Sequence, residues 1–100
     1  MSEENGGDDS GELTALRRAI EEIDRQIITL IGERLALAQR TGDIKREAGR
    51  PILDAAREAE VIRRAVNAAR ELGVPQEATR EIFWRIVGMS RGVQEDGSAP

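Results

Sequence analysis

The chain has 100 residues, of which 39% are hydrophobic and 34% charged, a balance typical of one small, helix-rich domain. It holds no Cys and no His, which excludes thiol nucleophiles, imidazole bases, disulfides and the common zinc and haem sites. The net charge of −4 is unevenly spread, because seven of the 19 acids lie in residues 1–12 and 95–100, and residues 13–94 hold 12 acids against 15 bases, a net charge of +3.

The predicted elements are all helical, because no segment alternates polar and apolar residues with period two. Residues 1–11 and 95–100 are too polar to fold alone, and we expect them to be disordered acidic tails. The folded domain is expected over residues 12–94, as three helices.

The first predicted helix is unusually long, from about residue 12 to about residue 48, with Ser10 or Thr14 as its cap and Gly49 at its stop. At 1.5 Å per residue it spans about 55 Å, while a compact 100-residue domain has a radius of gyration of about 13 Å. Its apolar positions follow an unbroken heptad spacing, which favours pairing with a second copy of the same helix. This seam comprises Leu16, Ile20, Ile23, Ile27, Leu30, Arg34, Leu37, Thr41, Ile44 and Ala48.

Two shorter helices are expected to follow. Asp54 is predicted to cap a second helix that ends at Leu72 before Gly73. Pro75 opens a third helix that should reach about Val93. The apolar positions are Val61, Ile62, Ala65, Ala69 and Leu72 in the second helix, and Ile82, Phe83, Ile86, Val87 and Met89 in the third.

Cations interrupt the apolar seam of the first helix. Arg34 lies at a seam position, and Lys45, eleven residues on, returns to within about 20° of the same face. The ordinary interpretation is a structural ion pair, but two long cations aimed at one groove favour an anionic ligand. Arg17 lies about 25 Å from Arg34 along the helix, so it would reach this groove only from the partner of an antiparallel pair. Otherwise Arg17 is an exposed helical arginine.

Polar residues extend the inward faces of the other two helices as well. Asp54 and Glu58 continue the apolar stripe of the second helix, one as an N-cap and the other within reach of an inward-facing Arg. Ser90 and Gln94 continue the stripe of the third, although a Gln at a helix end often faces solvent. Together these residues predict a groove for a polyanionic small molecule that carries hydroxyls. Any reaction there must be catalysed only by holding the substrate in a reactive conformation and by stabilising charge in the transition state.

These residues belong to a longer pattern: Leu16-Arg17, Ile20, Ile23-Asp24, Glu33-Arg34, Leu37-Ala38, Gly42-Asp43-Ile44-Lys45, Arg50-Pro51-Ile52-Leu53-Asp54, Arg57-Glu58, and Phe83 through Ser90 to Gln94. In this pattern residues 13–94 resemble the all-helical (AroQ-class) chorismate mutases. Ala55-Ala56 depart from it, since family members often carry a bulkier or charged residue there, and Gly92 weakens the third helix just before Gln94.

The resemblance implies an intertwined homodimer of six helices with two active sites, each built from both chains. It implies the rearrangement of chorismate, a dianion, to prephenate without metal or cofactor, with Lys45, Gln94, Arg34 and Glu58 as the catalytic residues. The substrate contacts it assigns are Arg34 and the partner chain's Arg17 to the two carboxylates, Lys45 and Gln94 to the ether oxygen, Glu58 with Asp54 to the ring hydroxyl, and Arg57 and Ser90 near the ring and a carboxylate.

Other functions remain open on the same residues. A 4-amino-4-deoxychorismate mutase would place an ammonium beside Glu58 and Asp54. An isochorismate-pyruvate lyase would keep the cationic groove, but the Arg50-Pro51-x-x-Asp54 sequence argues against it. A non-catalytic helical dimerisation module would use the same charges only as ion pairs. Stimulation by another enzyme of the shikimate pathway is a further possibility.

Two classes of partner are not expected. The chain has only 2% aromatic residues and its bases lie on several faces, which argues against nucleic-acid binding. It has no run of about 18 apolar residues and no apolar N-terminal segment, so we expect neither a membrane span nor a signal peptide. These features predict a cytoplasmic protein.

Overall fold

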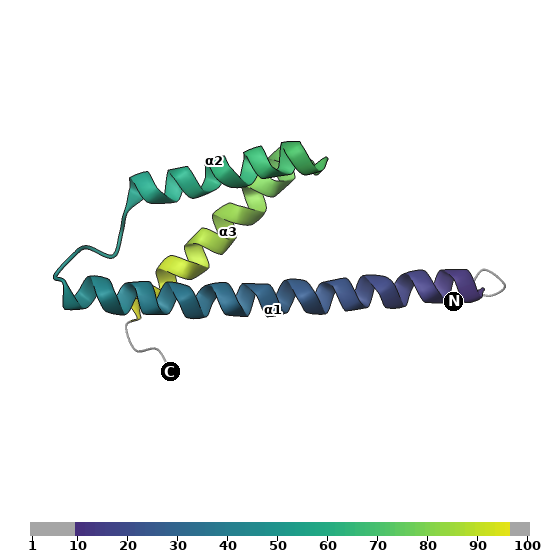
Figure 1. Ribbon diagram of the computed structural model, residues 1–100, viewed down its shortest axis with the longest axis horizontal. Helices are drawn as coiled ribbons and strands as arrows, with labels where there is room; N and C mark the ends of the chain where they lie inside the picture. The colour runs from purple at the N-terminus through teal and green to yellow at the C-terminus, as the bar shows by residue number, and fades with distance from the viewer. Residues whose placement is uncertain (1–9, 97–100) are drawn as a thin grey trace. The chain divides into compact units, whose positions relative to one another are not determined.

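The computed structural model describes residues 10–96, which form three helices and no strand. The helices are α1 (Gly11–Glu47), α2 (Ala55–Leu72) and α3 (Gln76–Glu95), labelled in Figure 1. The all-helical prediction is therefore confirmed for this part of the chain. Most of the predicted tails, residues 1–9 and 97–100, lies outside the described residues, while Gly11 and Glu95 are helical. The chain divides into two compact units, residues 1–32 and 33–100, and the boundary falls inside α1.

Local capping sets both ends of α1. The Ser10 hydroxyl accepts a hydrogen bond from the Leu13 N–H at 3.4 Å, so Ser10 rather than Thr14 is the cap. At the other end Gly49 has a φ of 68°, a left-handed conformation that glycine adopts without strain. The Gly49 N–H donates to the Arg46 carbonyl at 3.1 Å, and the Arg50 N–H donates to the Lys45 carbonyl at 2.8 Å. This pair of bonds is a Schellman motif, which ends the helix at Glu47.

The apolar seam of α1 is exposed along its whole length. Its seven large apolar side chains have exposed fractions between 49% and 64%. They are Leu16, Ile20, Ile23, Ile27, Leu30, Leu37 and Ile44. A continuous exposed apolar stripe of this kind is unusual for a face that only water contacts.

The helices α2 and α3 are also bounded as their local sequence requires. The Asp54 carboxylate accepts a hydrogen bond from the Arg57 N–H at 3.0 Å, which caps α2 as predicted. Gly73 ends that helix with a φ of 74°, and the Val74 N–H donates to the Ala69 carbonyl at 2.8 Å. Pro75 precedes α3, which reaches Glu95, two residues beyond the predicted end.

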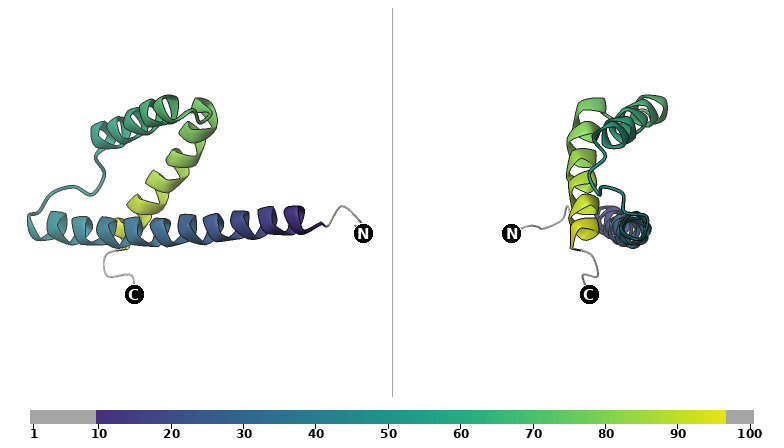
Figure 2. Two further views of the ribbon diagram at one scale, coloured as in Figure 1. Left: turned by 45° about the vertical axis from the view of Figure 1, so that its right-hand side comes forward. Right: turned by 90° about the vertical axis from the view of Figure 1, so that its left-hand side faces the viewer.

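The core lies between α2 and α3, which are joined by a short turn and run at an angle to each other in both views of Figure 2. Its buried residues are Ile62, Val66 and Val87, with Val61 and Phe83 packed against them. These side chains share the facing stripes of the two helices, so one small apolar cluster joins them.

Three of the predicted apolar positions are exposed instead. Leu72 is 77% exposed because it occupies the last turn of α2, which no other part of residues 10–96 covers. Ile82 and Met89 are 58% and 45% exposed. They lie about 140° and 160° around α3 from Val87, which places them on the opposite face of the helix.

Within the second unit, α3 also packs closely against the C-terminal part of α1. Gly42 is buried, and a Cβ built on it would lie 3.0 Å from the Cα of Gln94. Only a residue without a side chain allows the two helices to come this close. None of the helices in residues 10–96 is long and apolar enough to cross a membrane.

Candidate active site

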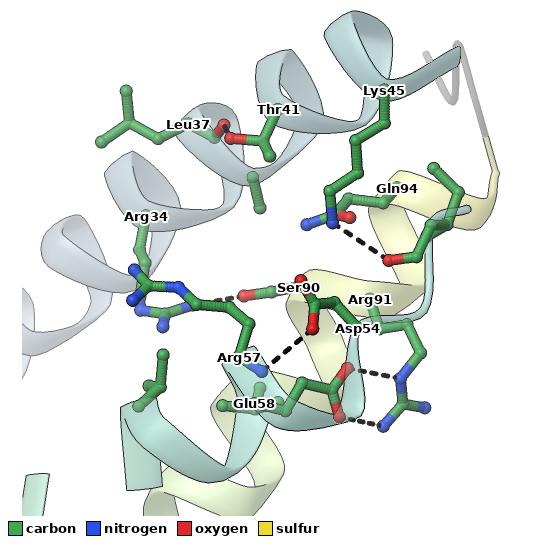
Figure 3. A pocket seen from close by; sticks show the side chains of 14 residues that line it. Arg34, Leu37, Thr41, Lys45, Asp54, Arg57, Glu58, Ser90, Arg91 and Gln94 are labelled. Carbon is green, nitrogen blue, oxygen red and sulfur yellow. Dashed lines mark hydrogen bonds and ion pairs between the residues drawn. The ribbon is translucent and has the colours of Figure 1, made fainter. Parts of the chain in front are cut away.

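A pocket of about 340 Å³ lies within the second unit, between the C-terminal part of α1, the loop that follows it, and the facing sides of α2 and α3. Seven of the eight predicted site residues line it: Arg34, Lys45, Asp54, Arg57, Glu58, Ser90 and Gln94. Figure 3 shows these side chains around one space. The eighth, Arg17, belongs to the N-terminal part of α1 and is not among the lining residues.

Arg34 is held by a buried hydroxyl of α3. Its Nη1 donates to the Ser90 Oγ at 2.5 Å, and the Ser90 hydroxyl in turn donates to the Ile86 carbonyl at 3.0 Å. Ser90 is only 7% exposed, so this hydrogen bond lies largely out of water. Because the single proton of Ser90 is committed to the helix backbone, its oxygen is oriented as an acceptor for Arg34. The guanidinium is thereby fixed at one side of the pocket.

Lys45 is anchored at another side of the pocket. Its Nζ donates to the Ile52 carbonyl at 3.1 Å, which ties the loop after α1 to the helix. An ammonium has three donors, so this bond leaves two for a ligand. Gln94 lies beside Lys45 in Figure 3. Its backbone carbonyl accepts a hydrogen bond from Arg46 at 2.5 Å, which leaves the side-chain amide in the pocket lining.

Asp54 and Arg57 bring opposite charges to the start of α2. The Asp54 carboxylate caps the helix through the Arg57 N–H. The Arg57 guanidinium pairs with Glu60 at 3.1 Å, and Glu60 also accepts from Arg64 at 2.9 Å. The hydrogen bond from Arg57 and the charge of Arg64 lower the pKa of Glu60 below its ordinary value of 4.5. Arg57 is 55% exposed, so a ligand needs to break only a weak surface ion pair to recruit it.

The sequence prediction missed one charged residue of the pocket, Arg91. Its Nε and Nη2 donate to the two carboxylate oxygens of Glu58 at 2.9 and 3.1 Å. Glu58 is largely buried, with a side chain 17% exposed. The signal that could have found Arg91 is its spacing, because it lies four residues after the buried Val87 and so points to the same side of α3.

The charges of the pocket do not cancel. Its lining holds four cations, Arg34, Lys45, Arg57 and Arg91, and two carboxylates, Asp54 and Glu58, a net charge of +2. Such a pocket suits a dianion that also offers a hydroxyl, and fixed cations can stabilise charge that grows during a reaction. Among residues 10–96, no three carboxylates gather as they would to hold a metal ion.

Comparison with known proteins gives consistent matches over most of the chain. The sequence model of the family described as chorismate mutase type II matches residues 16–95. The chorismate mutase of Methanocaldococcus jannaschii is 32% identical over 83 residues, which are 83% of this chain and 84% of that protein. The bifunctional chorismate mutase/prephenate dehydratase of Aquifex aeolicus is 40% identical over 79 residues, 76% of this chain.

The share of each relative that the chain spans, and one solved structure, complete the comparison. The chain spans only 22–24% of the length of three of the curated relatives that it matches, the Aquifex aeolicus protein among them. A solved structure, a conserved hypothetical protein from Pyrococcus furiosus, is 45% identical with a TM-score of 0.67. That match covers 85% of this chain and 97% of the other.

Proposed function

Because the chain belongs to the chorismate mutase type II family, we propose that it rearranges chorismate to prephenate. The observation that carries the proposal is the pocket, where seven residues of the predicted pattern meet around a net charge of +2. The substrate has two carboxylates, an ether oxygen and a ring hydroxyl. The pocket offers cations for the two carboxylates, an ammonium and an amide for the ether oxygen, and carboxylates for the ring hydroxyl.

The proposed mechanism needs no proton transfer. In the rearrangement the ether C–O bond breaks while a new C–C bond forms, and the electrons move around one cyclic transition state. Binding the dianion in a compact conformation excludes most of its unproductive conformations, which is the contribution of Arg34 and the partner chain's Arg17 at the two carboxylates, with Arg57 near one of them. Ser90 acts through Arg34, which it holds in place at 2.5 Å.

The rate increase comes from charge at the ether oxygen. Negative charge grows on this oxygen as the C–O bond lengthens, so a donor there binds the transition state more tightly than the substrate. Lys45 supplies a fixed ammonium with two donors left over from its bond to the Ile52 carbonyl. The Gln94 amide supplies a neutral donor beside it. Glu58, with Asp54, accepts the hydrogen bond of the ring hydroxyl at the other end.

We propose that the working form is an intertwined homodimer of six helices. The support is the exposed seam of α1, in which seven large apolar side chains at heptad spacing are about half exposed or more. In an antiparallel pairing the partner chain's Arg17 would complete the carboxylate site beside Arg34. A shared site of this kind makes activity depend on both chains.

Hybrid dimers test the shared site. Arg17→Ala and Arg34→Ala chains are each expected to be nearly inactive. Unfolding them together and refolding should pair half of the chains as hybrids, each with one intact site, and restore about a quarter of the parent activity. Mixed dimers that form, as shown by mass spectrometry, and yet remain inactive would contradict the shared site.

The proposal also covers the setting of the reaction. One relative joins a chorismate mutase to a prephenate dehydratase in its name. This association supports a partner enzyme of the same pathway that takes up the product, and we propose separately that the reaction takes place in the cytoplasm.

Product identification is the direct test of the reaction. The purified protein is given chorismate, isochorismate and 4-amino-4-deoxychorismate in parallel, and each product is identified by chromatography and mass spectrometry. Prephenate from chorismate is the expected result. Pyruvate from isochorismate would indicate a lyase, and no turnover of any of the three would favour a structural dimerisation module.

A further inference from the structure

Arg91 makes the most specific contact in the pocket, and the chemistry described so far leaves it without a role. Two parallel hydrogen bonds of 2.9 and 3.1 Å join its guanidinium to the two oxygens of Glu58. Figure 3 shows this pair, with Arg91 reaching Glu58 from α3. The residues are 33 positions apart, so the pair depends on the packing of α2 against α3.

The fork geometry fixes Glu58 without using up its capacity to accept hydrogen bonds. Two parallel bonds hold the plane of a carboxylate, which a single bond does not. A carboxylate has about four acceptor positions, so two remain for a ligand hydroxyl. Glu58 is 17% exposed and Arg91 35%, so water competes only partly for the pair. The hydrogen bond and charge of Glu58 raise the pKa of Arg91 above its ordinary value, so Arg91 stays charged.

Charge at this end of the pocket is therefore balanced. An unpaired Glu58 would attract an ammonium more strongly than a hydroxyl, because the attraction between full charges outweighs that to a neutral donor. Arg91 cancels that preference and places its own positive charge beside the same carboxylate. The other carboxylate, Asp54, caps α2 through the Arg57 N–H and keeps acceptor positions for the hydroxyl, and the partial positive charge at the N-terminus of that helix offsets part of its own charge.

We propose that Arg91 is a positioning and specificity-determining residue that orients Glu58 and makes the pocket select a substrate with a neutral hydroxyl over one with an ammonium at that position. This proposal rests on the proposed function, since it assigns the ring end of the substrate to Glu58. It explains how one carboxylate can discriminate between two substrates of nearly the same shape. Without Arg91 the net charge of the pocket falls from +2 to +1, and the electrostatic potential beside Glu58 becomes negative.

The test compares two variants on two substrates. Arg91→Met keeps an unbranched side chain but removes both the charge and the fork, and Arg91→Lys keeps the charge and removes the fork. For each protein kcat/KM is measured with chorismate and with 4-amino-4-deoxychorismate. Arg91→Met should lower kcat/KM for chorismate about tenfold or more. The ratio of kcat/KM for chorismate to kcat/KM for 4-amino-4-deoxychorismate should fall about tenfold. Arg91→Lys should lose rate on chorismate and keep the parent ratio.

The outcomes separate this proposal from the function on which it rests. An Arg91→Met variant with the parent substrate ratio would overturn the selectivity role, whether or not its rate falls, because a merely structural role would reduce both activities equally. Failure of Arg91→Lys to keep the ratio would show that charge is not the cause. If the parent turns over neither substrate, the proposed function fails and this proposal fails with it.

Discussion

Replacing Gly42 by Ala tests whether the contact between α1 and α3 positions Gln94. A Cβ at residue 42 would lie 3.0 Å from the Cα, Cβ and Cγ of Gln94. Ordinary carbon contacts are about 3.5–4.0 Å, so the backbone of α3 must move by about 0.5–1 Å. Such a displacement of a group that contacts the reacting atoms costs about a hundredfold in rate.

The matched control is Gly32→Ala in the same helix. A Cβ at residue 32 meets nothing within 4 Å, so this variant should gain the full advantage of Ala in a helix, about 1 kcal/mol. Gly42→Ala gains the same amount and loses about 1–3 kcal/mol to overpacking. Its free energy of unfolding should therefore fall below that of the control by about 1–3 kcal/mol.

The assay combines urea unfolding with steady-state kinetics on chorismate. We expect Gly42→Ala to remain folded, with kcat reduced about a hundredfold, while Gly32→Ala keeps the parent kcat. If Gly42→Ala proves as stable as the control and keeps the parent kcat, then the close approach of the helices does not position Gln94, and the reasoning is wrong.

The remaining predictions concern three other contacts. Ser90→Ala should raise KM for chorismate about tenfold, because it removes a hydrogen bond to a charged guanidinium, and an unchanged KM in steady-state kinetics would show that Arg34 needs no such support. Asp54→Ala should lower the free energy of unfolding by about 0.5–2 kcal/mol while Asp54→Asn keeps it, because Asn also caps a helix, and equal urea midpoints for the two variants would contradict the capping role. Glu60→Gln should lower the melting temperature at pH 7, and the difference from the parent should shrink as the pH falls below 4.5: because the folded-state pKa of Glu60 is lowered, its stabilisation is present above the ordinary pKa of 4.5 and is lost as the pH falls through the lowered value. A difference in melting temperature that does not change with pH in this range would refute the ionic origin of that stabilisation.

The bounds of the helices could be predicted from the sequence because local residues set them. Ser10, Gly49, Asp54 and Gly73 each act within one turn, and the observed ends of α1 and α2 lie within one residue of the prediction. The C-terminal end of α3 could be predicted less well from the sequence. Gly92 costs about 1 kcal/mol relative to Ala in a helix, yet α3 continues to Glu95, and its last turn is held by the hydrogen bond from Arg46 to the Gln94 carbonyl.

The candidate site was predictable only in part. Helical spacing indicated which faces of the helices carry Arg34, Lys45 and Glu58, and these faces line one pocket. It did not indicate which cation pairs with Glu58, because that choice depends on how α2 packs against α3 over 33 residues of separation. The apolar pattern also failed for Leu72, because exposure depends on whether another element covers a helix end.

The central claim is that a fixed ammonium in this pocket stabilises the transition state more than the substrate. Its most direct test is the steady-state kinetics of Lys45→Met on chorismate, with Arg40→Met, which removes the same charge from an exposed position outside the pocket, as the control. Loss of a donor to developing charge costs about 10²–10³ in kcat, so kcat of Lys45→Met should fall by that factor with little change in KM, while Arg40→Met keeps both. A Lys45→Met variant that keeps the parent kcat, or loses only affinity, would contradict the account.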